Sequence, residues 1–332
     1  GGLLIIGGVG SGKSTVLQTI VYGLIQQYTA EELHIYGMDL GNQSLQAFEM
    51  APQVGGMVLP DDSERIGRCF RMLKVQMEQR KKQMRGGTYE QYRLRASERL
   101  PAILLLIDDY SEFRERTENR YEKQLVRIAK EGISCGIYLI VTAAGVGMAE
   151  IPMSIARSIR QVLCLSLPDR FQYMELLHLT QVPTPPEAVP GRGLWKEGER
   201  VLEGQVALPV DAEDDYERLQ KLRDTCAEMA NRWTGAHARS IPQIPDGTGL
   251  DDFLQNAEIQ ALLTDPYAVP FGYDMDQATV VSLDLRTLFC WLILGRAKSG
   301  KQNLLQVLAA VAQKKKGTAV VVDFEQKWRR HG

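Results

Sequence analysis

The sequence has no long apolar run, no paired cysteine motif and almost no net charge, and each absence excludes a class of protein. Its longest apolar runs, residues 103–107 and 289–294, are far shorter than the roughly 20 residues of a membrane-spanning helix. We therefore expect this piece to be soluble and any membrane anchor to lie outside it. Five scattered cysteines without C-x-x-C spacing and four dispersed histidines indicate neither a disulfide framework nor a zinc site. A net charge of −2 gives no overall indication of nucleic-acid binding, although a local patch could still bind it.

What is present is an ordinary globular composition over a length that suits two domains. The chain has 332 residues, of which 44% are hydrophobic and 24% charged. Short apolar segments alternate with helical segments, which is typical of an α/β fold with a mainly parallel sheet. We expect strands at residues 3–6, 33–38, 102–107, 137–142 and 162–167, and helices at 13–27, 64–85 and 211–233.

A basic stretch covers residues 65–99, and two interpretations of it stay open. It could be a surface for nucleic acid or an acidic partner, or a solvated helix, since glutamates are interleaved with the basic residues. No aromatic residues alternate with the charges as a base-stacking surface would require, which favours the solvated helix. The basic residues are Arg65, Arg68, Arg71, Lys74, Arg80, Lys81, Lys82, Arg85, Arg93, Arg95 and Arg99.

The strongest motif is a complete phosphate loop between the first strand and the first helix. Glycines let the backbone amides fold closely around phosphates, and the following helix presents its positive dipole end. The pattern predicts that Lys13 reaches the β- and γ-phosphates of ATP, and that the Ser14 hydroxyl ligates Mg²⁺. The predicted nucleotide-binding residues are Gly7, Gly8, Val9, Gly10, Ser11, Gly12, Lys13, Ser14 and Thr15.

Two carboxylates follow the apolar strand 102–107. Asp108 has the Walker B position, where a carboxylate completes the magnesium shell, so we assign it to cofactor and metal binding with Ser14. Asp109 and Lys13 are the candidate catalytic residues. Asp109 would orient the attacking water, but it is one methylene shorter than the glutamate common there, so we expect weak turnover. Glu112 is a weaker candidate. Thr142 could sense the γ-phosphate or could have no role.

The phosphate loop recurs in a second, altered copy. Gly295, Gly300 and Lys301 align with Gly7, Gly12 and Lys13 at one offset, but Gln302 replaces the magnesium-ligating serine. A second strand follows each copy, ending in Asp39 and Asp323, and the chain looks cut from a longer protein with several modules. We predict a module at residues 1–210, a helical and extended linker at 211–270, and the truncated start of a second module at 271–332. The second loop remains a candidate phosphate site without catalysis.

The order of these motifs resembles the FtsK/SpoIIIE ATPases, and more closely their type VII secretion branch, the EssC/EccC proteins. The resemblance rests on the tandem loops, on Ile107-Asp108-Asp109-Tyr110 and on the strand at residues 136–142. The closing segments 190–194 and 204–209, the linker 241–245 and the lead-in 270–274 also fit that branch. The resemblance covers nearly the whole chain. It implies a RecA-like P-loop NTPase module followed by part of a second one.

The resemblance implies an ATP-binding module of a protein secretion motor on the cytoplasmic side of a bacterial membrane. Its partners would be small helical export substrates or their C-terminal signal, neighbouring ATPase modules and further copies of the chain. Two alternatives remain, a DNA translocase and a degenerate ATPase that serves as a docking platform. DNA is disfavoured because Thr142-Ala143-Ala144 lacks the glutamine of the DNA-translocating relatives. Three candidates for an arginine finger are more simply structural: Arg157, Arg160 and Arg170.

Overall fold

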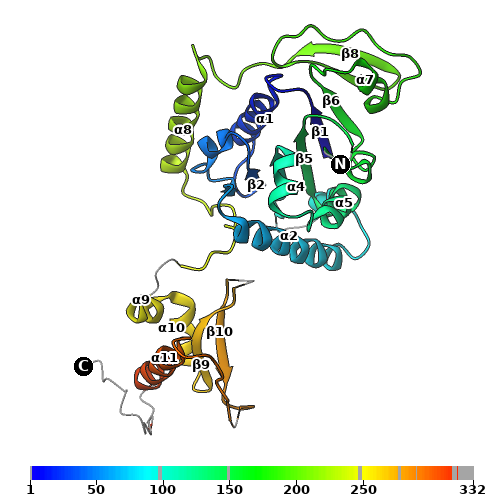
Figure 1. Cartoon of the computed structure of the whole chain (residues 1–332). Coiled ribbons are helices and arrows are strands. Elements are labelled where there is room, and N and C mark those ends of the chain that lie inside the picture. The colour runs from blue at the N-terminus through cyan, green and yellow to red at the C-terminus, as the bar shows by residue number, and fades with distance from the viewer. Residues whose placement is uncertain are drawn as a thin grey trace. The chain divides into compact units, whose positions relative to one another are not determined.

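The computed structural model divides the chain into two units, Gly1–Ile241 and Pro242–Gly332 (Figure 1). It describes all residues except 1, 96–98, 148–149, 246–248, 276–277, 289, 316–319 and 321–332.

The first unit is built on one mainly parallel sheet. Within its described residues the sheet has eight strands in the order β3-β2-β4-β5-β1-β6-β7-β8. The first six strands run parallel, whereas β7 and β8 form an antiparallel hairpin at one edge. The strands are β1 (Gly2–Ile6), β2 (Leu33–Asp39), β3 (Val54–Val58), β4 (Ala102–Asp108), β5 (Ile137–Ala143), β6 (Gln161–Cys164), β7 (Arg192–Glu197) and β8 (Arg200–Gln205).

Helices cover both faces of this sheet, so its central strands are apolar throughout rather than alternating. Successive residues of β4 enter opposite cores: Ile103 and Ile107 lie in one, Leu104 and Leu106 in the other. The helical elements are α1 (Lys13–Gln27), η1 (Ser44–Phe48), α2 (Ser63–Met84), α3 (Tyr89–Arg95), α4 (Tyr110–Arg116), α5 (Glu122–Glu131), η2 (Gly132–Cys135), α6 (Met153–Ala156), α7 (Arg170–Leu176) and α8 (Asp215–Arg232). The α/β fold expected from the sequence is confirmed.

Three strands of the first unit were not expected from the sequence. Strand β3 contains Gly55 and Gly56, which weaken a strand pattern, and Gly55 lies so close to Tyr36 and the Arg239 carbonyl that a Cβ would meet them at 2.3 and 2.4 Å. The hairpin β7–β8 is charged and half exposed, so it carries no apolar run. The last expected strand, 162–167, is found as β6 and ends earlier, at Cys164.

The structure places the interval 211–270 differently from the expected linker. Helix α8 packs on the first unit, where its Leu222 and Cys226 are fully buried with residues of α1 and η1. These two residues are four positions apart and therefore lie on one helix face. Residues 250–264 instead form helices of the second unit. The division falls between Ile241 and Pro242.

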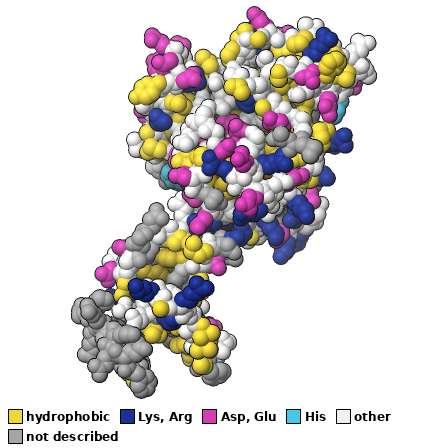
Figure 2. Space-filling model, in the orientation of Figure 1, with side chains coloured by type: hydrophobic (Ala, Val, Ile, Leu, Met, Phe, Trp, Pro, Cys, Tyr) yellow, Lys and Arg dark blue, Asp and Glu magenta, His cyan; other side chains and the backbone are white. Residues whose placement is uncertain are grey.

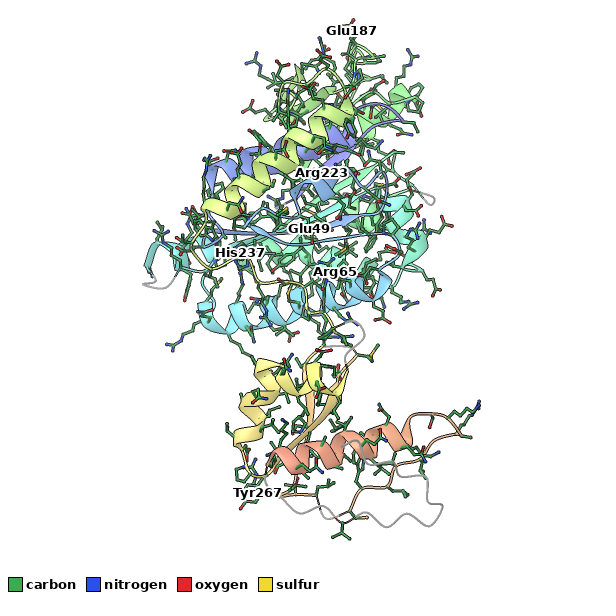
Figure 3. The ribbon with its side chains drawn as sticks, turned by 90° about the vertical axis from the view of Figure 1, so that its left-hand side faces the viewer. Glu49, Arg65, Glu187, Arg223, His237 and Tyr267 are labelled. Carbon is green, nitrogen blue, oxygen red and sulfur yellow. The ribbon has the colours of Figure 1, made fainter. Side chains whose placement is uncertain are left out.

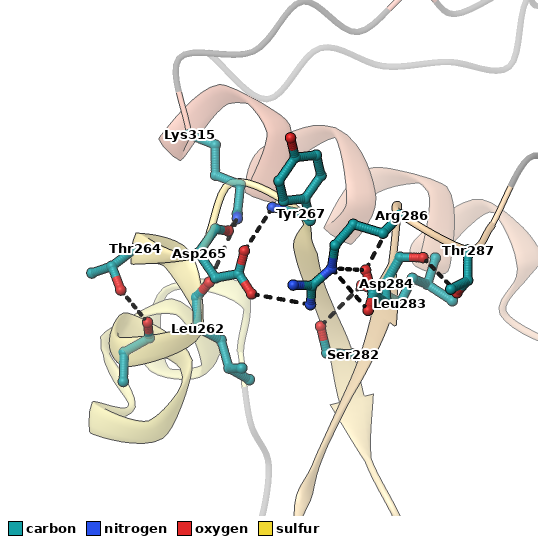
Figure 4. A network of polar contacts seen from close by, with 11 residues as sticks. Leu262, Thr264, Asp265, Tyr267, Ser282, Leu283, Asp284, Arg286, Thr287 and Lys315 are labelled. Atoms are coloured by element: carbon teal, nitrogen blue, oxygen red, sulfur yellow. Dashed lines mark hydrogen bonds and ion pairs between the residues drawn. The ribbon is translucent and has the colours of Figure 1, made fainter.

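The second unit is a small antiparallel β-ribbon with three helices among its described residues. Its core contains Phe253, Leu254, Ile259 and Val311. Near the end of the ribbon, Arg286 pairs with Asp284 at 2.8 Å and with Asp265 at 3.6 Å (Figure 4). The elements are α9 (Leu250–Gln255), α10 (Ala257–Thr264), β9 (Ala268–Tyr273), β10 (Val280–Asp284) and α11 (Lys301–Lys314).

Neither the apolar run at residues 289–294 nor the strand expected to end at Asp323 is found as a strand among the described residues of the second unit. Residues 290–294 have no regular secondary structure, and Phe289 lies outside the described residues. The strand predicted to end at Asp323 also lies outside them.

Candidate nucleotide-binding site

The phosphate loop lies between the end of β1 and the start of α1, as the sequence predicts. Gly10 and Gly12 have φ of 74° and 95°, in the left-handed region that favours glycine. A Cβ on Gly12 would also lie 2.8 Å from the Gly191 amide nitrogen, because the segment before β7 crosses the loop there. The Gly191 amide donates to the Ser11 carbonyl at 2.8 Å. The loop is therefore held in shape by chain far away in sequence.

Lys13 points back into this loop. Its Nζ donates to the carbonyl oxygens of Gly7 at 2.7 Å and Gly8 at 2.9 Å. Burial lowers the pKa of Lys13, while the nearby carboxylates of Asp108, Asp109 and Glu150 act in the opposite direction. Glu150 follows β5 and was not singled out from the sequence, because no motif marks it. The lysine is thus a partly buried cation held by two carbonyls of the loop.

The predicted magnesium ligands are in direct contact. The Ser14 hydroxyl donates to Oδ2 of Asp108 at 2.8 Å, and the Thr142 hydroxyl donates to Oδ1 at 2.7 Å. Burial raises the pKa of Asp108, and these two hydrogen bonds partly offset that effect. A hydroxyl and a carboxylate side by side at the start of a helix suit Mg²⁺, which takes oxygen ligands and keeps several waters. This donor set fits the ion.

Thr142 has a different place from that of a phosphate sensor. It is fully buried, its hydroxyl donates to Asp108, and the same oxygen accepts the amide of Asp109 at 2.8 Å. Thr142 therefore positions Asp108, the last residue of β4, and Asp109, which follows that strand.

Asp109 lies beside the loop, but its carboxylate caps a helix. It has φ of 64° and precedes α4, where Oδ1 accepts from the Ser111 hydroxyl at 2.6 Å and from the Glu112 amide at 3.3 Å. The weaker candidate, Glu112, pairs with Arg116 at 2.5 Å. Both carboxylates consequently have structural partners that compete with a role as a base.

Asp39 is a buried carboxylate that the sequence marked only as a strand end. It is paired in register with Asp108 across β2 and β4, and none of it is exposed. Its Oδ2 accepts the amides of Leu45 and Gln46 at 2.8 and 3.0 Å, and so fixes η1. Among the described residues its Oδ1 has no hydrogen-bond partner. Burial first, and the charge of Asp108 second, raise the pKa of Asp39 to about 7.

The loop opens into a cavity of about 550 Å³. The loop itself and the first residues of α1 line one part of it, and the rest is lined by Asn42, Pro190, Gly191, the segment after β8 and the start of α8. This volume falls in the range of small-molecule and cofactor sites, roughly 300–1,000 Å³.

The second loop repeats the shape of the first. Gly300 has φ of 90°, and Lys301 Nζ donates to the carbonyls of Gly295 and Arg296 before α11 begins. Gln302 is exposed where the first loop has its hydroxyl ligand. The loop geometry is kept, whereas the hydroxyl that the sequence predicts as a magnesium ligand is replaced by an amide.

The remaining candidates lie away from the loop or have structural partners. Arg157 and Arg160 line a different cavity, beside Gly2 at the start of β1, whereas the phosphate loop follows the end of that strand. Arg170 contacts the Phe171 ring.

In the basic stretch, Arg80 is 2% exposed and donates to the carbonyls of Cys135 and Pro101 at 2.9 and 2.7 Å. The charged side chains over the rest of α2 are mainly basic, with Glu64 and Glu78 among them. Lys and Arg side chains gather along the lower edge of the first unit in Figure 2.

Two kinds of feature are absent from the residues that the structure describes. No helix there is both long and apolar enough to cross a membrane. No cluster of three or more His, Cys, Asp or Glu side chains that could hold a metal ion occurs in that part of the chain.

A phosphate loop on the central strand of a parallel sheet, with a serine–aspartate pair beside it, defines a nucleotide-binding P-loop ATPase domain. The FtsK/SpoIIIE family model matches residues 1–93. The chain is similar to the FtsK/SpoIIIE-type ATPases, and its relatives are EssC and EccC proteins of type VII secretion systems.

The relatives match along nearly the whole chain. EccC of Geobacillus thermodenitrificans is 28% identical over 312 residues, which are 93% of this chain and 20% of that protein. YukB of Bacillus subtilis is 26% identical over 312 residues, which are again 93% of this chain and 20% of that protein. The chain thus spans about one fifth of the length of these relatives.

Solved structures share this fold. EssC ATPases 2 and 3 of Geobacillus thermodenitrificans superimpose with a TM-score of 0.79 and 26% identity, over 94% of this chain and 59% of that one. Thermomonospora curvata EccC, solved in complex with a signal sequence peptide, has a TM-score of 0.69 and 24% identity. The match covers 94% of this chain and 56% of that one.

Proposed function

We propose that this chain is an ATP- and Mg²⁺-binding module of a type VII secretion motor, which couples nucleotide binding to the export of small helical proteins. The observation that carries the proposal is the intact first loop with its Ser14–Asp108 pair, in a chain whose relatives are secretion ATPases. The motor would act at the cytoplasmic side of the membrane, anchored by segments outside this chain.

The chain's own residues suggest how the nucleotide is held. Lys13 would exchange the carbonyls of Gly7 and Gly8 for phosphate oxygens, and the loop amides would bind the same phosphates. Ser14 and Asp108 would hold Mg²⁺, which neutralises charge on the phosphates. Thr142 keeps Asp108 turned toward Ser14 by occupying its other oxygen.

We expect hydrolysis by this chain to be slow, below about 1 s⁻¹ and thus under the range of typical enzymes. The Asp109 carboxylate is short and is engaged as the cap of α4. Asp109→Glu should raise the rate about ten-fold, because the longer side chain can reach an attacking water and misplacements of about 1 Å cost large factors. Steady-state phosphate release measures this. Asp224→Glu on the exposed face of α8 is the matched control and should change nothing.

A fast wild-type enzyme would contradict this assignment, as would no response to Asp109→Glu. Complete absence of turnover in both proteins would favour the docking platform over the ATPase.

The secretion role predicts a peptide partner rather than DNA. A fluorescent peptide carrying the C-terminal signal of an export substrate should bind the chain, as the solved Thermomonospora relative suggests. Duplex DNA should bind weakly and lose affinity steeply between about 50 and 200 mM salt, because only phosphate contacts would hold it. Lys81→Glu with Lys82→Glu should remove that residual binding and leave peptide affinity unchanged.

Anisotropy titrations with both probes test this directly. A salt-resistant DNA complex, or ATP turnover that rises several-fold on adding duplex, would instead support the DNA translocase.

A further inference from the structure

Helix α8 lies against α1, the helix that follows the phosphate loop (Figures 1 and 3). Arg218 of α8 is only 9% exposed, and its Nε donates to Oε1 of the buried Gln18 at 3.0 Å. Gln18 in turn lies one turn beyond Ser14, on the inner side of α1. A polar contact from α8 therefore reaches the back of the nucleotide site.

The cavity beside the loop continues past the phosphate-binding residues. After Ser14 and Thr15 its walls are the chain leaving β8, through Val206 and Leu208, and Arg218 with Asp215 of α8. This chain is fixed on α1, because the Thr19 hydroxyl donates to the Ala207 carbonyl at 2.7 Å. The far end of the cavity thus belongs to residues about 190 positions after the loop.

The chemistry of this far end differs from that of the loop. It offers the apolar side chains of Val206 and Leu208, and the planar guanidinium of Arg218, which is paired with the Asp215 carboxylate at 2.8 Å. A guanidinium stacks on flat aromatic rings, apolar side chains cover their faces, and a carboxylate accepts hydrogen bonds from sugar hydroxyls. These groups suit a nucleoside and not a phosphate chain.

We propose that this end of the cavity binds the base and ribose of the nucleotide, with the base between Arg218 and Leu208. The inference rests on nucleotide binding at the first loop, as proposed above, and adds α8 to the site. Leu208 is 52% exposed at the cavity wall, so a base packing there would cover apolar surface. Because the nucleotide would touch α8 only when that helix is docked, binding and docking are thermodynamically linked.

The test compares two ligands on the full 332-residue chain by calorimetry. A non-hydrolysable ATP analogue fills the whole cavity, whereas inorganic tripolyphosphate occupies the loop alone. Arg218→Ala and Leu208→Ser should each lower the affinity for the analogue by about ten-fold or more. The affinity for tripolyphosphate should stay within about two-fold of the wild-type value. Arg223→Ala, an exposed arginine on the same helix (Figure 3), should affect neither ligand.

Hydrogen exchange of the α8 amides gives a second measurement. Amides that exchange only when α8 undocks should exchange up to about 100-fold more slowly with the analogue at about 100 times its Kd. Tripolyphosphate should slow them less.

Each outcome decides a separate point. If both variants lower the affinities for the two ligands equally, or change neither affinity, the nucleoside assignment is wrong while nucleotide binding stands. If Lys13→Ala changes neither affinity, nucleotide binding at this loop is itself wrong. Should Arg218→Ala fail to fold, Leu208→Ser decides alone, because its side chain lies half exposed outside the core.

Discussion

Lys13→Ala is expected to weaken ATP binding by about 100-fold or more. The ammonium group would lose two charge-assisted contacts to phosphate, each worth roughly 1.5–3 kcal/mol, and about 1.4 kcal/mol corresponds to ten-fold in affinity. Loop shape should suffer less, because Gly7 and Gly8 also donate their amides to the carbonyls of Ala143 and Ser166 at 3.1 and 2.8 Å. Calorimetry with an ATP analogue and Mg²⁺ measures the change.

Lys301→Ala is the matched control, since Lys301 makes the same contacts in the second loop. It should leave the affinity of the first site unchanged. Equal affinity of wild type and Lys13→Ala would refute binding at the first loop. Loss of Mg²⁺-dependent binding in Lys301→Ala alone would place the working site in the second unit.

Asp39→Asn should stabilise the chain above neutral pH by up to about 4 kcal/mol. Burial and the charge of Asp108 raise the pKa of Asp39 from 3.8 to about 7 in the folded state. The folded state therefore binds more protons than the unfolded state between these values, so wild-type stability falls as pH rises through that window. Each pH unit of the window corresponds to at most about 1.4 kcal/mol. Asparagine keeps an oxygen for the Leu45 and Gln46 amides and carries no charge.

Urea denaturation without nucleotide or Mg²⁺, followed at pH 5 and pH 8, measures this difference. The gain in unfolding free energy should be large at pH 8 and small at pH 5. Asp61→Asn, at an exposed position, should change stability at neither pH. The same gain at both pH values would mean that shape, and not charge, sets the effect.

The site shows which residues a sequence can identify. The phosphate loop is contiguous and each of its residues has a local reason, so its position and its placement between strand and helix were predictable. Asp108 was predictable because it ends an apolar strand. Asp39 was not predictable as part of the site, since its proximity to Asp108 depends on which strands are neighbours in the sheet.

The same distinction explains Asp109 and Thr142. The sequence marks Asp109 as the residue after the Walker B aspartate, but its positive φ and its cap on α4 depend on the turn that follows β4. Thr142 is a strand-end threonine in the sequence, and only the parallel pairing of β4 with β5 brings its hydroxyl to both aspartates.

The sequence by itself determined that this chain carries a phosphate loop, an α/β domain and a second, altered loop, because local glycine spacing and apolar periodicity suffice for those conclusions. The tertiary structure alone decided that α8 belongs to the first unit and that its Arg218 lines the same cavity as Ser14. The physical reason is that a charged helix with few apolar residues resembles a linker until the surface that buries Leu222 and Cys226 is known.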